Sequence, residues 1–126
     1  MLLQDASVGQ RLAHRRYELG HRIVDAAGLG GVDTKTWMGW EREEHAPTVQ
    51  HYPALIRYLG SEPWAVPDTL GDRLLAQRRR LGLSIKRAAI ISGVDEGTFR
   101  RWERGDWKPQ PRSLSLIEAF LERAEI

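Results

Sequence analysis

The chain has no cysteine among its 126 residues. Disulfide bonds and thiolate metal sites are therefore excluded. It also lacks a run of about 18 apolar residues and an N-terminal signal-peptide pattern, so we expect a soluble, cytoplasmic protein without a membrane anchor. With 41% apolar and 29% charged residues, the composition is that of an ordinary globular chain, long enough for one medium domain or two small ones.

Patterns typical of enzymes and metal sites are missing as well. His14 and His21 are separated by Gly20, which should end a helix, and His45 and His51 fall in or near a predicted loop without a further ligand. The carboxylates are scattered, no nucleophile has a base at motif spacing, and no glycine loop follows a predicted strand. We therefore expect no enzyme activity, no metal and no cofactor.

What the sequence does have is a strong pattern between residues 84 and 105. Ser84 can cap a helix over residues 85–91, and Gly93 can end it. Asp95 can then cap a second helix over residues 96–104. Two short helices joined by a tight glycine turn form a helix-turn-helix, whose second helix fits the major groove of DNA.

The second helix has two different faces. Phe99 and Trp102 are three residues apart and should both point into a core. The opposite face is largely basic, and it carries Glu96, Gly97, Arg100, Arg101 and Arg104.

The sequence also repeats itself without a gap. An offset of 62 residues takes Trp40-Glu41-Arg42 to Trp102-Glu103-Arg104. The same offset pairs Gly9 with Gly71, Leu12 with Leu74, Arg16 with Arg78, Ala26-Ala27 with Ala88-Ala89, Gly31-Val32-Asp33 with Gly93-Val94-Asp95, and Pro47 with Pro109. A match of this kind predicts two copies of one small domain. We expect an all-α chain with a first domain over residues 1–60, a proline-containing linker over 61–68 and a second domain over 69–126.

Residues of the second copy resemble the phage-repressor (Xre-like) helix-turn-helix family of bacterial DNA-binding regulators. The resemblance is carried by Ala88-Ala89, Gly93-Val94, Thr98, Trp102-Glu103-Arg104-Gly105 and Pro109. It implies two tandem domains of the phage-repressor type and a bacterial or phage transcriptional regulator that binds double-stranded DNA sequence-specifically. It also implies that Arg78 pairs with Glu103, and Arg16 with Glu41, as structural ion pairs between first and third helices.

Charge separates the two copies. Residues 8–60 have seven Lys and Arg against six acids, whereas residues 70–122 have eleven against seven. Because phosphate contacts supply most of the affinity for nucleic acid, we expect the second copy to be the main DNA anchor.

In the second copy we expect base contacts from the outward face of the second helix and phosphate contacts around it. The expected base contacts are Glu96, Gly97, Arg100 and Arg101, with Arg101 paired to guanine and Glu96 accepting from cytosine. The expected phosphate contacts are Ser84, Lys86, Arg87, Thr98, Arg104, Lys108 and Arg112. The alternative interpretation of Arg100 and Arg101 is a solvated helix face.

The first copy departs from a good DNA reader. It has Met38 and Gly39 where the second has arginines, and Glu43 where the family has glycine after Trp-Glu-X, which leaves the end of its helix open. The expected base contacts there are Thr34, Lys35 and Met38, and the expected phosphate contacts are Arg22 and Thr36. Met38 beside Trp37 could instead form an apolar patch for a protein partner or for self-association.

Trp64 in the linker is a second candidate for such an interaction, and we expect it to pack between the domains. The alternative to a DNA-binding regulator is a protein-interaction adaptor of a mobile-element or defence system, in which one or both copies no longer read DNA.

Overall fold

The computed structural model describes residues 6–126, and within that range the chain is entirely helical, with no strand. It divides into two compact units, Met1–Ala65 and Val66–Ile126. The all-α class predicted from the sequence is confirmed for the described residues.

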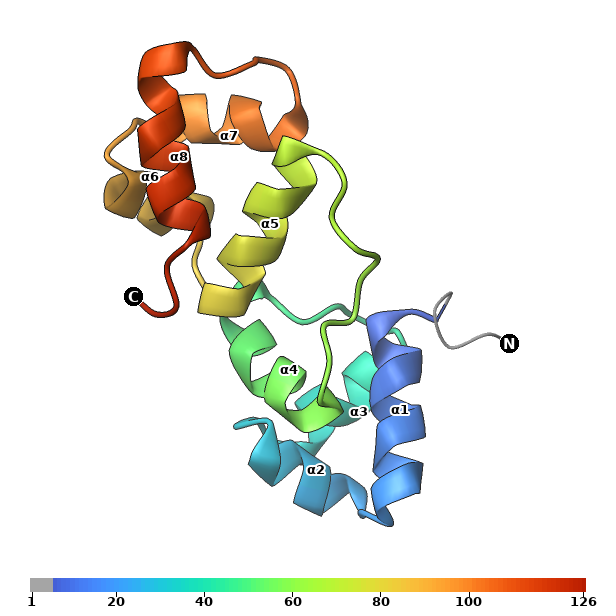
Figure 1. Cartoon of the computed structure of the whole chain (residues 1–126). Helices are drawn as coiled ribbons and strands as arrows, with labels where there is room; N and C mark the ends of the chain where they lie inside the picture. The colour runs from blue at the N-terminus through green and yellow to red at the C-terminus, as the bar shows by residue number, and fades with distance from the viewer. Residues whose placement is uncertain (1–5) are drawn as a thin grey trace. The chain divides into compact units, whose positions relative to one another are not determined.

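In its described residues, 6–65, the first unit contains four α-helices and a short 3₁₀ helix (blue to green in Figure 1). In chain order these are α1 (Val8–Leu19), α2 (Ile23–Leu29), α3 (Thr34–Glu41), the 3₁₀ helix η2 (Val49–His51) and α4 (Tyr52–Leu59).

The second unit has the same order of elements (yellow-green to red in Figure 1). They are α5 (Leu70–Leu81), α6 (Ile85–Ser92), α7 (Glu96–Arg104), the 3₁₀ helix η3 (Pro111–Ser113) and α8 (Leu114–Leu121).

Short polar side chains start the helices where the sequence predicts it. The Ser84 hydroxyl accepts from the Arg87 amide at 3.2 Å, and the Asp95 carboxylate accepts from the Thr98 amide at 2.8 Å. Between these caps, Gly93 takes a φ of 78°, a left-handed conformation that side chains disfavour, and so ends α6.

The last helix of the first unit starts in two steps. The side chain of Thr48 makes no cap bond, and the chain after it first forms the 3₁₀ turn η2. The α-helix begins only at Tyr52, with Pro53 in its first turn. Proline fits there because the first amides of a helix have no partner inside it.

Each unit has its own apolar core. In the first, Trp37 packs edge-on against Tyr58 with ring centroids 5.1 Å apart. In the second, Phe99 packs edge-on against Phe120 at 5.5 Å, and both rings are buried. These two pairs occupy equivalent positions of the repeat, so the offset of 62 residues describes packing as well as sequence.

Backbone approaches are duplicated too. A Cβ added to Gly9 would collide with the carbonyl oxygen of Trp40, and one added to Gly71 with that of Glu103. Because only glycine leaves that space, the first helix of each unit lies directly on the end of the third.

The third helix ends in the same way in both units, although the residue types differ. Glu43 takes a φ of 60° where Gly105 takes 79°. The next amides, of Glu44 and Asp106, each donate at 2.9 Å to a helix carbonyl, that of Gly39 and that of Arg101 respectively. The substitution of glycine by Glu43 therefore does not change how α3 closes, but it places a side chain in a conformation that costs roughly 1–2 kcal/mol.

Residues 6–126 include no helix with the length and apolar character that a membrane crossing requires. In the same range, no three His, Asp or Glu side chains gather in a way that could hold a metal ion.

Candidate nucleic-acid interface

A nearly buried ion pair fixes α7 on its unit. The Arg78 guanidinium, on α5, donates to both carboxylate oxygens of Glu103 at 3.0 and 2.8 Å, and each side chain is 12% exposed. A third guanidinium donor reaches the Leu83 carbonyl oxygen at 3.1 Å. Because a two-point pair of this kind sets orientation as well as distance, it fixes how α7 presents its outer face.

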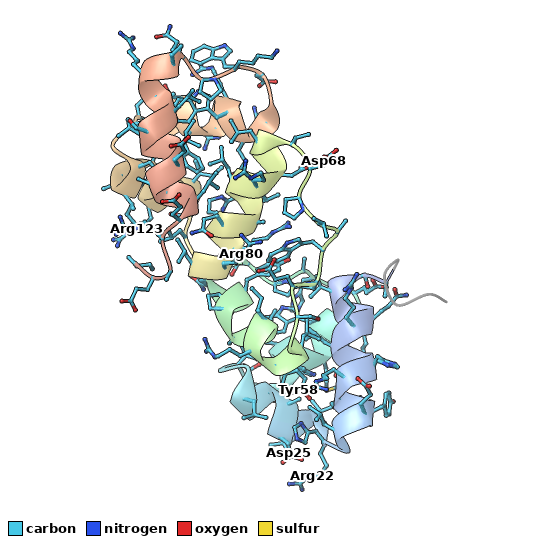
Figure 2. The ribbon with its side chains drawn as sticks, in the orientation of Figure 1. Arg22, Asp25, Tyr58, Asp68, Arg80 and Arg123 are labelled. Atoms are coloured by element: carbon cyan, nitrogen blue, oxygen red, sulfur yellow. The ribbon has the colours of Figure 1, made fainter. Side chains whose placement is uncertain are left out.

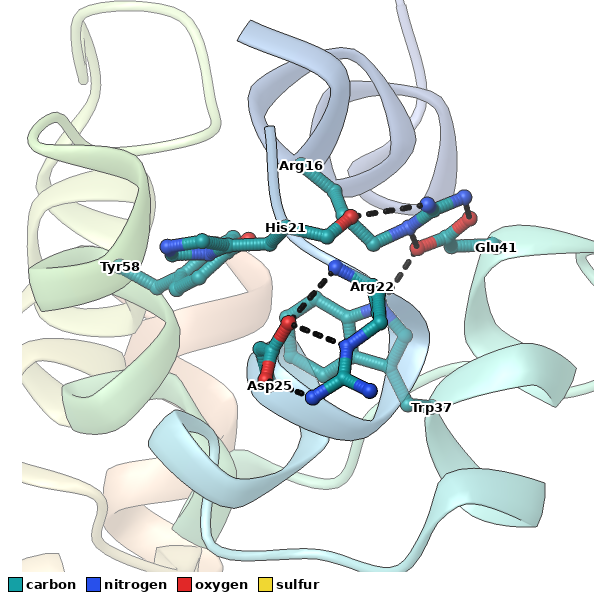
Figure 3. Close-up of polar contacts among 7 residues, drawn as sticks. All are labelled: Arg16, His21, Arg22, Asp25, Trp37, Glu41 and Tyr58. Atoms are coloured by element: carbon teal, nitrogen blue, oxygen red, sulfur yellow. Dashed lines mark hydrogen bonds and ion pairs between the residues drawn. The ribbon is translucent and has the colours of Figure 1, made fainter. Parts of the chain in front are cut away.

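The first unit contains the equivalent pair with one more donor. Arg16 donates to Glu41 at 2.7 and 2.9 Å, and the Trp37 indole donates to the same carboxylate at 2.5 Å (Figure 3). The hydrogen bonds to Glu41 hold the pKa of Arg16 above its ordinary value. Phe99, the equivalent of Trp37, has no polar atom, so the first unit carries one polar contact that the second lacks.

The charged side chains on the outward face of α7 are accessible to solvent. Arg100 donates to Glu96 at 3.1 Å, and their side chains are 41% and 46% exposed. Arg101 is exposed as well. Neither arginine is buried in the core, so both remain accessible to a ligand.

Arg101 has a defined surrounding even though it is exposed. Its guanidinium carbon lies 4.3 Å from the centre of the Trp107 ring, which belongs to the loop after α7. A Cβ added to Gly97 would lie 3.0 Å from an Arg101 nitrogen. The guanidinium therefore has an indole ring and a bare stretch of helix as neighbours.

The start of α7 carries an ionised cap. The side chain and amide of Thr98 both donate to Asp95, at 2.7 and 2.8 Å, and these bonds lower the pKa of that carboxyl. Thr98 is one of the expected phosphate contacts, and in this structure its hydroxyl donates a hydrogen bond to Asp95.

Most expected phosphate-binding residues of the second unit are exposed around α6 and α7. These are Ser84, Lys86, Arg87, Arg104, Lys108 and Arg112. Lys108 and Arg112 line a depression of about 550 Å³ together with Thr98 and Trp107. The structure thus brings three of the expected phosphate contacts to one hollow beside α7.

In the first unit the corresponding surface is weaker in charge. Thr34 and Lys35 are exposed on α3, whereas Thr36 and Met38 are half-buried. Arg22 is 79% exposed, but it lies against Asp25 at the start of α2, at 3.2 Å (Figure 2).

The idea that Trp37 forms a patch for a protein partner is wrong. Trp37 is fully buried in the first unit's core, because it occupies the position of Phe99 in the repeat. Trp64 packs on Tyr52 within the first unit, with ring centroids 5.9 Å apart. A role for Trp64 in binding a partner stays a prediction.

Two residues beside the third helices were not among the predicted site residues. Trp107 contacts Arg101, and in the first unit the His45 ring occupies the space where a side chain on Gly39 would lie. His45 and Trp107 are related by the offset of 62 residues, as are Gly39 and Arg101. The repeat aligns these positions, but it does not single them out, because their residue types differ between the two copies.

In comparisons with protein-family models, curated proteins and solved structures, no family model, protein or structure matches the chain.

Proposed function

We propose that the chain is a sequence-specific double-stranded DNA-binding protein of the phage-repressor type, acting as a transcriptional regulator. In this proposal each unit is a helix-turn-helix domain, and α7 of the second unit inserts into the major groove. The observation that carries the proposal is the exposed face of α7, which presents Arg101 next to a glycine on a rigidly held helix.

The surroundings of α7 support the same function. The two-point pair between Arg78 and Glu103 fixes the helix without consuming the charges on its outer face. Exposed lysines and arginines flank that face on both sides, as a groove-binding helix requires for phosphate neutralisation. We infer that Arg101 reads a guanine and that Glu96 and Arg100 act beside it.

The first unit supports a subordinate role in DNA binding. Lys35 is the only cation between residues 34 and 41, and Gly39 offers no side chain where Arg101 stands in the second unit. We infer that this unit adds affinity through a few contacts and contributes little to sequence readout.

A second candidate is a protein-interaction adaptor in which the first unit binds a partner. The observation that favours it is the same poor charge of α3, together with the half-buried Met38 on that helix. In this case replacing Lys35 by alanine would not change the affinity for DNA.

Selection of bound sequences from random duplexes tests the proposal, because it reports both binding and site length. We expect enrichment of one short site. R101A should relax the preference at one base pair, at a cost of roughly 1–3 kcal/mol, whereas R104A should weaken binding to all duplexes alike.

The matched control is R57A, which removes the same charge from an exposed position on α4. It should leave the selected sequence unchanged. Recovery of no enriched sequence, or equal effects of R101A and R57A, would contradict the proposal.

A further inference from the structure

Trp107 is a large aromatic side chain that stays 51% exposed in the loop after α7. Its ring centre lies 4.3 Å from the guanidinium carbon of Arg101, well within the range of a cation–π contact. About half of the indole surface is covered, and the guanidinium of Arg101 is part of what covers it.

Gly97 lies beside the same guanidinium. A Cβ at this position would come within 3.0 Å of an Arg101 nitrogen and 3.3 Å of an Asp95 carboxylate oxygen. A methyl group on residue 97 would therefore make the guanidinium shift by a few tenths of an ångström. The guanidinium of Arg101 thus contacts the Trp107 ring and has one nitrogen beside Gly97.

A guanidinium that stacks on a ring does so with its flat face, which leaves its N–H donors in the plane for a ligand. Within residues 6–126 the structure gives this side chain no hydrogen bond or ion pair. The side chain also runs back along α7 toward Gly97, in the first turn, and the N-terminal part of a recognition helix is the part that contacts base edges.

We propose that Trp107 is a specificity-determining positioning residue, whose ring holds Arg101 over Gly97 so that the guanidinium meets a guanine edge in one fixed orientation. This inference rests on the proposed function, since it needs DNA as the ligand. A long arginine side chain loses rotamer freedom when it binds, and a stack already present in the free protein removes part of that loss.

The first unit supplies an internal control for this inference. There His45 stands at the position of Trp107, and its ring fills the space beside Gly39 that an arginine would need. The ring position after the third helix is thus occupied in both units, but only the second has a cation for it to orient. Removing the His45 ring should therefore not change base discrimination.

The test compares W107A, W107F, W107L, G97A and H45A with the unchanged protein. For each, affinity is measured for the selected duplex and for the duplex changed at the one base pair whose preference R101A abolishes. Thermal unfolding and the salt dependence of binding are recorded in parallel, because a loss of fold or of phosphate contacts would change these two quantities.

We expect W107A and W107L to lower the discrimination at that base pair about two- to fivefold, the range of an exposed cation–π contact. Binding to unrelated duplexes, the salt slope and the melting temperature should change little. W107F keeps an aromatic face and should restore most of the discrimination, and H45A should match the unchanged protein.

The variant G97A separates an effect on base discrimination from an effect on the stability of the fold. Alanine is a better helix former than glycine, and the new methyl group meets only the flexible end of Arg101 and the Asp95 carboxylate. The variant should therefore unfold at the same or a higher temperature while discrimination falls two- to fivefold.

Two results would overturn the inference alone. One is unchanged discrimination in W107A, and the other is rescue by W107L as complete as rescue by W107F, which would reduce the ring to a space filler. A protein that binds no duplex at any salt concentration would instead overturn the proposed function, and this inference with it.

Discussion

The third helices of the two units, α3 and α7, have nearly the same supports and different outer faces. Each is clamped by an arginine from the first helix of its unit and ends with a left-handed residue. The outer faces differ, because Thr34, Lys35, Met38 and Gly39 in the first unit correspond to Glu96, Gly97, Arg100 and Arg101 in the second, and His45 corresponds to Trp107. The two units thus share the residues that fix the third helix, and they differ in the side chains that this helix presents at its surface.

The ion pairs give the largest expected effect. E103A should lower the free energy of unfolding of the second unit by about 3 kcal/mol, because it leaves the Arg78 charge almost buried without its partner. E41A should cost the first unit more, since it also leaves the Trp37 indole N–H without its acceptor.

Hydrogen exchange of core amides during denaturant titration measures these losses for each unit separately. R57A, an exposed change on α4, is the control and should alter neither unit. If E41A and E103A cost less than about 1 kcal/mol, the two pairs would be dispensable and the shared support of the helices would lie elsewhere.

A graft of the second unit's face onto the first should change DNA binding. G39R combined with H45W and K35G gives the first unit the arginine, the indole and the glycine that the second unit has at these positions. We expect tighter binding by roughly 1–3 kcal/mol for sites with a guanine within reach. Duplex titration measures the gain.

The single change G39R is the matched control for the graft, because its side chain must compete with the His45 ring. It should gain less than the triple variant. Equal affinity of the unchanged and grafted proteins would indicate that the first unit does not approach DNA.

The left-handed residue after each third helix gives a smaller, symmetrical effect. E43G should stabilise the first unit by up to about 1 kcal/mol, because glycine adopts a φ of 60° without a steric penalty. G105A should destabilise the second unit by a similar amount. Denaturant midpoints of the two variants should therefore shift in opposite directions, and a shift in the same direction would contradict this account.

The caps Asp33 and Asp95 give the smallest effect, which depends on pH. Hydrogen bonds from Thr36 and Thr98 lower the pKa values of the two carboxyls below their ordinary 3.8. Their contribution to stability is therefore present above pH 3.8 and is lost as the pH falls through the lower, folded-state pKa.

Melting temperatures measured between about pH 5 and pH 2 should fall for the unchanged protein. D95N keeps a hydrogen-bond acceptor at the cap but cannot be protonated in this range, so it should show a shallower fall. A fall as steep as that of the unchanged protein would mean that this cap does not contribute to acid sensitivity.

Local signals in the sequence were enough to predict most of the helices. Ser84, Asp95 and Gly93 act on their immediate neighbours, so their effect does not depend on the rest of the fold. The offset of 62 residues then predicts the corresponding helix boundaries in the first half of the chain. The two ion pairs were expected from the family resemblance, and both are present.

The predictions were weaker where tertiary packing decides. Trp37 was taken for a surface residue, although the offset that pairs it with Phe99 already places it in the core. Trp107 was not singled out, because the path of a loop after a helix is not fixed by helical periodicity. The sequence does not predict where α3 ends, because Glu43 stands where the family has glycine. In the structure Glu43 itself adopts the left-handed φ that ends the helix, although residues with a side chain disfavour that conformation.

Whether the exposed face of α7 binds duplex DNA is tested most directly by the salt dependence of binding to a selected duplex. We predict that the logarithm of the affinity falls linearly with the logarithm of salt concentration, with a slope of roughly −0.9 for each phosphate contacted. R104A should make that slope shallower by about one, and R57A should leave it unchanged. A flat salt dependence, or the same slope in R104A as in the unchanged protein, would contradict the assignment of this face to DNA.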